Sequence, residues 1–294
     1  MRIPQFVFHA IVLSSAFLIS SARAEDVPVK SGEKIAFMGD SITQDGASGP
    51  GGYVHLVISG LKAIGIQATA IPAGISGHKS NDMLKRLEKD VIVKKPDWMT
   101  LSCGVNDVWH GANGVPLPDY KTNITSIIDQ CQKAGIKVMI LTSTMIGEDQ
   151  ANANNQKLME YNAFLRSLAA EKKCLLADLN QEMQDTLKEI AKTDSSKNNK
   201  VTRDGVHMNP AGNRMMAMGI LKAFGLNAEQ QEKVKEAWMD IPNTATVGGN
   251  ISLTQRQYMQ LAELAAKDKH TVDELVRGEI DKAVQALLKQ AAGK

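Results

Sequence analysis

Short apolar runs alternate with longer amphipathic segments over the first three quarters of the chain. The runs are too short for helices and are rich in side chains that favour strands. They lie at about 34–38, 67–71, 97–102, 136–141 and 174–177. Between them, apolar residues recur at helical spacing over about 53–64, 80–88, 120–134, 155–172 and 211–224.

This alternation predicts βαβ units and therefore a parallel sheet. Right-handed crossovers place helices on both faces of such a sheet. We therefore predict a three-layer α/β/α fold with a central, parallel, mostly five-stranded sheet. Binding sites in these folds lie outside the carboxyl ends of the strands. Ser41, Gly77, Asn106 and the loop after Leu141 are all predicted to lie at that edge.

The sequence becomes helical in character beyond Gly225. A helix to about Trp238 is followed by a linker over 241–249, which contains Pro and Gly, and by amphipathic segments at about 254–267 and 272–289. No residue of this tail has catalytic character, and no internal repeat is visible. We predict a main domain over residues 25–226 and a helical C-terminal extension over 227–294, which packs on the domain or supports a homo-oligomer.

The first 24 residues have the features of a secretory signal peptide. Arg2 gives a positive start, 6–19 form a short apolar core, and Ala22-Arg23-Ala24 is an A-x-A cleavage site. An uncleaved N-terminal anchor is the alternative interpretation. Later apolar runs are much shorter than a membrane span. We therefore predict cleavage after Ala24, a secreted or periplasmic location, and no stable membrane span in the mature chain.

The charge balance argues against a polyanionic partner. The chain has 34 basic and 32 acidic residues, and loss of Arg2 and Arg23 with the signal peptide leaves 32 of each. A nucleic-acid-binding protein would show a basic footprint, so no nucleic acid partner is expected. Three widely spaced cysteines (Cys103, Cys131 and Cys174) predict mainly buried thiols, with one disulfide left open. No Cys/His spacing resembles a zinc site, and no metal or organic cofactor is implied.

The first apolar run of the domain leads directly into Gly39-Asp40-Ser41. Such a turn places a serine at the end of a buried strand and the start of a helix, where backbone N–H groups can hold an oxyanion. An ordinary turn after a strand is the alternative, because Gly-Asp and Asp-Ser are common turn pairs. The glycine-rich segment 46–52 lacks the Gly-Lys-Ser/Thr ending of a phosphate loop, so we interpret it as a mobile rim.

Asp204 and His207 make the catalytic interpretation of Ser41 the stronger one. The carboxylate can accept a hydrogen bond from Nδ1–H of the imidazole while Nε2 faces a serine, which then has a general base. Alone, Asp-x-x-His would more simply be a surface turn. Acyl transfer also needs donors for the developing oxyanion. The backbone N–H of Gly77 and the side-chain amide of Asn106 are candidates.

At these residues the sequence resembles the SGNH (GDSL) hydrolase superfamily. The resemblance rests on Gly39-Asp40-Ser41, Ile75-Ser76-Gly77, Gly104-Val105-Asn106-Asp107 and Asp204-x-x-His207, four blocks in the right order. It implies a flavodoxin-like fold, with Ser41 as nucleophile, His207 as base and Asp204 as its orienting residue. It also implies an oxyanion hole formed by Ser41, Gly77 and Asn106. Thr43 replaces the second glycine of Gly-x-Ser-x-Gly, which disfavours an α/β-hydrolase elbow.

Within the superfamily, Lys95-Pro96-Asp97-Trp98 and the block with Trp109 resemble bacterial carbohydrate acetylesterases, which act on xylan and xylo-oligosaccharides. The resemblance implies a secreted serine esterase for small acyl esters, with an acetylated carbohydrate or small ester as substrate. Asp40, Trp109 and His110 are the candidate substrate-binding residues, although Trp109 could equally be a packing residue. A lipase, lysophospholipase or thioesterase on the same fold is the alternative. A non-catalytic carbohydrate-binding protein is a further one.

Overall fold

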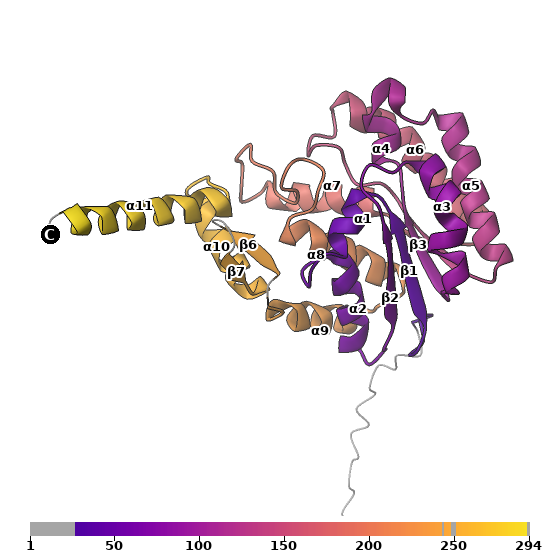
Figure 1. The fold of residues 1–294 in the computed structure, drawn as a ribbon, viewed down its shortest axis with the longest axis horizontal. Coiled ribbons are helices and arrows are strands. Elements are labelled where there is room, and N and C mark those ends of the chain that lie inside the picture. Colours follow the sequence, from indigo (N-terminus) through magenta and orange to yellow (C-terminus); the bar gives the residue numbers. More distant parts are fainter. Residues whose placement is uncertain (1–26, 243, 248–250, 293–294) are drawn as a thin grey trace, which may run out of the picture.

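The computed structural model describes residues 27–242, 244–247 and 251–292 (Figure 1). The predicted signal peptide lies outside the described residues. Five parallel strands form one sheet in the order β2-β1-β3-β4-β5. The strands are β1 (Lys34–Gly39), β2 (Thr69–Gly74), β3 (Trp98–Ser102), β4 (Lys137–Leu141) and β5 (Leu175–Ala177). The predicted parallel five-stranded sheet is confirmed.

Helices cover both faces of this sheet, so the three-layer architecture is also confirmed (Figure 1). One face carries α3 (Ser80–Asp90), α5 (Leu117–Lys133) and α6 (Ala153–Glu171). The other carries α2 (Tyr53–Ala63), α7 (Leu179–Ile190), α8 (Pro210–Ala223) and α9 (Ala228–Met239). Phe37 of β1 meets Tyr53 edge to face, and Tyr120 meets Tyr161 under the opposite layer. All four rings are buried, and burial of the apolar Phe37 side chain alone stabilises the fold by about 1.5–3 kcal/mol.

The register aligns the carboxyl ends of the strands. Gly39 pairs with Gly74, and Met38 pairs with Leu101, one residue before the end of β3. The turns that follow β1, β2 and β3 therefore leave the sheet side by side. They carry the three predicted blocks that contain Ser41, Gly77 and Asn106.

Strand β2 begins and ends later than the predicted 67–71, because pairing with β1 sets its limits. It includes Pro72, which cannot donate a hydrogen bond to a neighbouring strand. Proline is tolerated here because β2 lies at the edge of the sheet. Its side chains are mostly exposed or half-buried, unlike those of β1.

Helix α7 was absent from the sequence-based prediction. Its N-cap is Asp178, whose side chain accepts a hydrogen bond from the backbone of Gln181. Leu179, Met183 and Leu187 follow at intervals of four and pack on the core. The sequence therefore contains the helical spacing of apolar residues, but the segment is short and lies between a weak strand and a polar loop.

The extension differs from its predicted all-helical form. Two short antiparallel strands are present: β6 (Ala245–Val247) lies in the segment predicted as a linker, and β7 (Ile251–Leu253) lies between that segment and the next predicted helix. Helices α10 (Gln255–Lys267) and α11 (Val272–Ala292) confirm the two amphipathic segments, and α11 projects away from the sheet (Figure 1). Ala265 and Val272 form a small apolar cluster of their own. No helix in the described ranges is long and apolar enough to span a membrane.

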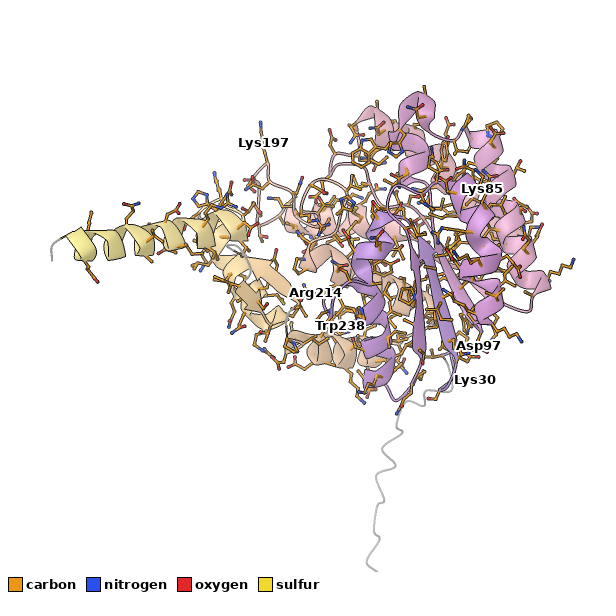
Figure 2. The ribbon with its side chains drawn as sticks, viewed as in Figure 1. Lys30, Lys85, Asp97, Lys197, Arg214 and Trp238 are labelled. Atoms are coloured by element: carbon orange, nitrogen blue, oxygen red, sulfur yellow. The ribbon has the colours of Figure 1, made fainter. Side chains whose placement is uncertain are left out.

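Helix α9 packs on the main domain through Trp238. The indole is 1% exposed, and its Nε1–H donates to the backbone oxygen of Leu56 at 3.1 Å (Figure 2). Val234 of the same helix is also buried in the main core. The first helix of the extension is therefore fixed to α2.

Candidate active site

Ser41 is the first residue of α1 (Ser41–Gly46), directly after β1. Asp40 caps this helix, because its Oδ1 accepts the backbone N–H of Ile42 at 2.9 Å. A Cβ on Gly39 would overlap the side chain of Thr43, which is itself bonded to the Tyr53 hydroxyl at 2.8 Å. The turn that presents Ser41 therefore requires glycine immediately before the acidic cap.

His207 lies between Ser41 and Asp204. Its Nε2 is 2.9 Å from Oγ of Ser41, and its Nδ1 is 2.6 Å from Oδ2 of Asp204. Because the carboxylate can only accept, Nδ1 is assigned the proton and Nε2 accepts the serine O–H. Burial alone would raise the pKa of Asp204, but the backbone N–H groups of His207 and Val206 and the imidazole hold that pKa below its usual value.

Glu148, in the loop after β4, fixes the segment that leads to His207. Its carboxylate accepts hydrogen bonds from the backbone N–H groups of Lys200, Val201 and Thr202 at 2.6, 2.9 and 2.7 Å. It also accepts the Thr202 hydroxyl at 2.7 Å. The backbone of neighbouring Gly147 donates to the oxygen of Gly205 at 2.6 Å. Sequence reasoning missed Glu148, because no local pattern links it to a loop more than fifty residues away.

The two oxyanion-hole candidates from other turns are linked through His78. Gly77 has φ of +75°, a conformation that favours glycine, and no atom would lie within 4 Å of an added Cβ. Asn106, on α4 (Val105–Trp109), is 5% exposed, and its Nδ2 donates to the backbone oxygen of His78 at 3.1 Å. This bond uses one of the two amide N–H groups and ties Asn106 to the residue after Gly77.

Arg86 and Asp107 stabilise the turns after β1, β2 and β3 through hydrogen bonds. Arg86 of α3 donates to the backbone oxygens of Gly39 and Ala73, each at 2.8 Å, and to Nδ1 of His78 at 3.1 Å. Asp107 accepts both the backbone N–H and the hydroxyl of Ser80, at 3.0 and 2.6 Å. The start of α3 is therefore fastened to α4, which sets the position of Gly77 relative to Asn106.

The model of the GDSL-like Lipase/Acylhydrolase family matches residues 37–215, which is more than half of the chain and includes every block described above. This chain belongs to that family.

Named relatives are acetylxylan esterases. One from Geobacillus stearothermophilus is 28% identical over 218 residues, which cover 67% of this chain and 96% of that protein. The crystal structure of the acetyl xylan esterase AlAXEase is 37% identical with a TM-score of 0.60, over 65% of this chain and 98% of its own. The structure of Axe2, an acetylxylan esterase from Geobacillus stearothermophilus, is 27% identical with a TM-score of 0.60. The match covers 68% of this chain and 97% of that one. The chain is therefore a carboxylic ester hydrolase of the SGNH superfamily.

Two of the predicted substrate-binding residues of this hydrolase lie beside Asn106. Trp109 is 47% exposed, and its ring is nearly parallel to that of His110, with ring centroids 6.4 Å apart. Nδ1 of His110 is 3.1 Å from the backbone oxygen of Asn106. The Trp109 ring is therefore exposed on α4 rather than packed under the loop.

Asp40, the third predicted substrate-binding residue, has a different place in the structure. It is only 2% exposed, and its carboxylate caps α1. Burial raises the pKa of Asp40 to about 6, and the charge of Asp107 adds to the rise. Burial likewise raises the pKa of Asp107. The prediction that Asp40 binds substrate is therefore corrected: its buried carboxylate caps the helix that begins at Ser41.

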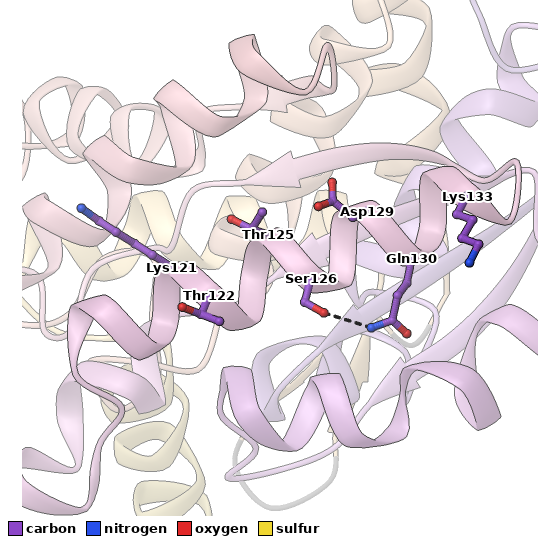
Figure 3. Close-up of a pocket in the computed structure, with 7 residues that line it drawn as sticks. All are labelled: Lys121, Thr122, Thr125, Ser126, Asp129, Gln130 and Lys133. Carbon is purple, nitrogen blue, oxygen red and sulfur yellow. Dashed lines mark hydrogen bonds between the residues drawn. The ribbon is translucent and has the colours of Figure 1, made fainter.

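A shallow hollow of about 590 Å³ on α5 lies apart from these residues (Figure 3). Its side chains all come from one helix, and Gln130 donates to the Ser126 hydroxyl at 3.0 Å. None of the predicted site residues lines it. Within the described ranges, no group of three or more His, Cys, Asp or Glu side chains could hold a metal ion.

Proposed function

We propose that this hydrolase is a secreted acetylesterase that removes acetyl groups from polysaccharide or oligosaccharide by a Ser-His-Asp mechanism. The observation that carries the proposal is the pair of short contacts from Asp204 through His207 to Ser41, 2.6 and 2.9 Å long. The acetylxylan esterases among its relatives support the choice of acyl group and substrate class. The signal-like segment 1–24 supports secretion.

In this mechanism, Nε2 of His207 takes the proton of the Ser41 hydroxyl as Oγ bonds to the acetyl carbonyl carbon. The carbonyl oxygen becomes an oxyanion that accepts hydrogen bonds from the backbone N–H groups of Ser41 and Gly77 and from the Asn106 amide. The C–O bond to the sugar then breaks, and His207 returns the proton to the departing hydroxyl.

The acetyl group is left on Oγ of Ser41. Water, deprotonated by His207, attacks this acyl-enzyme and releases acetate, and the proton on His207 returns to Ser41. Asp204 stays ionised throughout, which agrees with its lowered pKa. It keeps Nδ1 protonated and the imidazole in position.

The test measures initial rates on p-nitrophenyl acetate, butyrate and octanoate, together with acetate release from acetylated xylan. We expect rates to fall with acyl length, and Ser41→Ala to lose about 10⁴-fold or more in kcat. Ser126→Ala, which changes a half-buried serine on α5, is the matched control and should keep wild-type rates.

A rise in rate towards octanoate would instead identify a lipase, lysophospholipase or thioesterase with the same nucleophile. Full activity of the folded Ser41→Ala variant would refute the mechanism. Absence of turnover of all esters would support the non-catalytic alternative.

A further inference from the structure

A groove of about 1040 Å³ lies between the main domain and the extension. We name it the extension groove. One wall is formed by α10 and the start of α11, including Tyr258 and Ala262, and the other by the segments 45–52 and 193–203. Its volume matches the upper range of ligand-binding pockets, about 300–1,000 Å³.

Two residues that line the groove are close in sequence to the proposed catalytic residues. Asp45 lines it and lies four residues after Ser41 on α1, so the two side chains lie on the same side of that helix. Arg203 also lines it and directly precedes Asp204. The two groove residues form an ion pair, which joins the nucleophile helix to the loop of His207.

Charge in the groove is close to balanced: Lys197, Lys200 and Arg203 line it together with Asp45, Asp194, Glu263 and Asp273. Arg203 pairs with Asp45, and Lys200 pairs with Asp194 at 2.5 Å. The lining also contains hydroxyl and amide side chains, among them Ser48 and Asn199. Such a surface offers many donors and acceptors without a dominant sign of charge. It suits a neutral, hydroxyl-rich chain better than a polyanion or an acyl chain.

The part of the extension that forms one wall of the groove packs directly on the main domain. A Cβ on Gly51 would overlap the backbone of Thr244, so glycine allows the two segments to touch. Arg214 of α8 donates to Sδ of Met259 on α10 at 2.8 Å, where α8 faces the extension (Figure 2). Gly51, in the glycine-rich segment predicted as a mobile rim, therefore packs against the extension, and these contacts hold the extension wall of the groove in place.

From these observations we infer that the extension groove binds the sugar chain of an acetylated oligosaccharide while its ester is held at Ser41. The inference rests on the proposed function and extends it to residues beyond the family match, which ends at residue 215. It gives the extension a role in selecting substrates with several sugar units.

The test compares kcat/KM on acetylated xylobiose and acetylated xylohexaose, with p-nitrophenyl acetate as a reference ester that is too small to fill the groove. Ala262→Trp places a large ring in the groove. Leu264→Trp is the matched control, because Leu264 is 48% exposed on the same helix and does not line the groove. Ser48→Trp obstructs the opposite wall and serves if Ala262→Trp does not fold.

We expect the wild type to prefer the hexamer to the dimer by about tenfold or more, and Ala262→Trp or Ser48→Trp to abolish that preference. Leu264→Trp should retain it. The inference is overturned if both groove variants keep the preference. It is also overturned if the wild type hydrolyses p-nitrophenyl acetate without any gain from longer chains, although the esterase mechanism then stands. Failure on every acetyl ester would refute the proposed function itself.

Discussion

The clearest structural prediction concerns Glu148, which fixes the loop carrying Asp204 and His207. Its Oε1 accepts three hydrogen bonds, from the backbones of Val201 and Thr202 and from the Thr202 hydroxyl, and its Oε2 accepts one from Lys200. A hydrogen bond to a charged group contributes about 1.5–3 kcal/mol, but these bonds share one half-buried carboxylate and are not additive. We therefore expect Glu148→Ala to cost about 2–4 kcal/mol of unfolding free energy.

Glu148→Gln should cost less, about 1–2 kcal/mol, because its oxygen can keep the Oε1 contacts while its NH₂ group opposes the Lys200 N–H. Urea unfolding measures both values, and Glu160→Gln, an exposed glutamate on α6, is the control. Because His207 would be held less firmly, kcat on p-nitrophenyl acetate should fall in the order wild type, Gln, Ala. Unchanged urea midpoints and unchanged kcat in both variants would refute this reasoning.

Three further predictions concern the proposed Ser-His-Asp triad, the buried carboxyl group of Asp40 and the packing of α9 on the main domain. Asp204→Asn should remain folded but lower kcat by about 10⁴-fold, because Asn can favour the wrong imidazole tautomer; a small effect on kcat would contradict the assignment. The pKa of Asp40 in the folded protein, about 6, lies above the usual 3.8. The protonated carboxyl therefore contributes fully to the free energy of unfolding below pH 3.8, and this contribution is lost as pH rises through 6. Urea unfolding should thus show Asp40→Asn gaining about 2–3 kcal/mol relative to wild type between pH 4 and 7, and a pH-independent difference would contradict this. Trp238→Ala should cost about 3–5 kcal/mol of unfolding free energy, whereas a cost below about 1 kcal/mol would mean that α9 is not part of the main core.

The sheet and the catalytic candidates were predictable because each follows from a local pattern. Apolar runs give buried strands, and the aligned strand ends place Ser41, Gly77 and Asn106 at one edge. The resemblance of four short blocks to one superfamily supplied the roles. Helix α7 has apolar residues at intervals of four, so it too was predictable from a local pattern.

Long-range contacts could not be predicted in the same way. Glu148 accepts hydrogen bonds from backbone N–H groups, and Arg86 donates to backbone oxygens, of distant turns. Every residue has such backbone groups, so the sequence does not indicate which of them a side chain will bind. The depth at which Asp40 is buried, and the close approach of Gly51 to Thr244, likewise depend on how separate elements pack. The pair β6 and β7 was not predicted because each strand is only three residues long.

The most direct measurement for the central claim is covalent labelling of the serine nucleophile. The purified protein is incubated with a fluorophosphonate, and the modified peptide is identified by mass spectrometry. We predict rapid, one-to-one labelling of Ser41, lost in Ser41→Ala and greatly slowed when His207 is replaced by alanine. No labelling, or labelling at another serine with Ser41 untouched, would contradict the account.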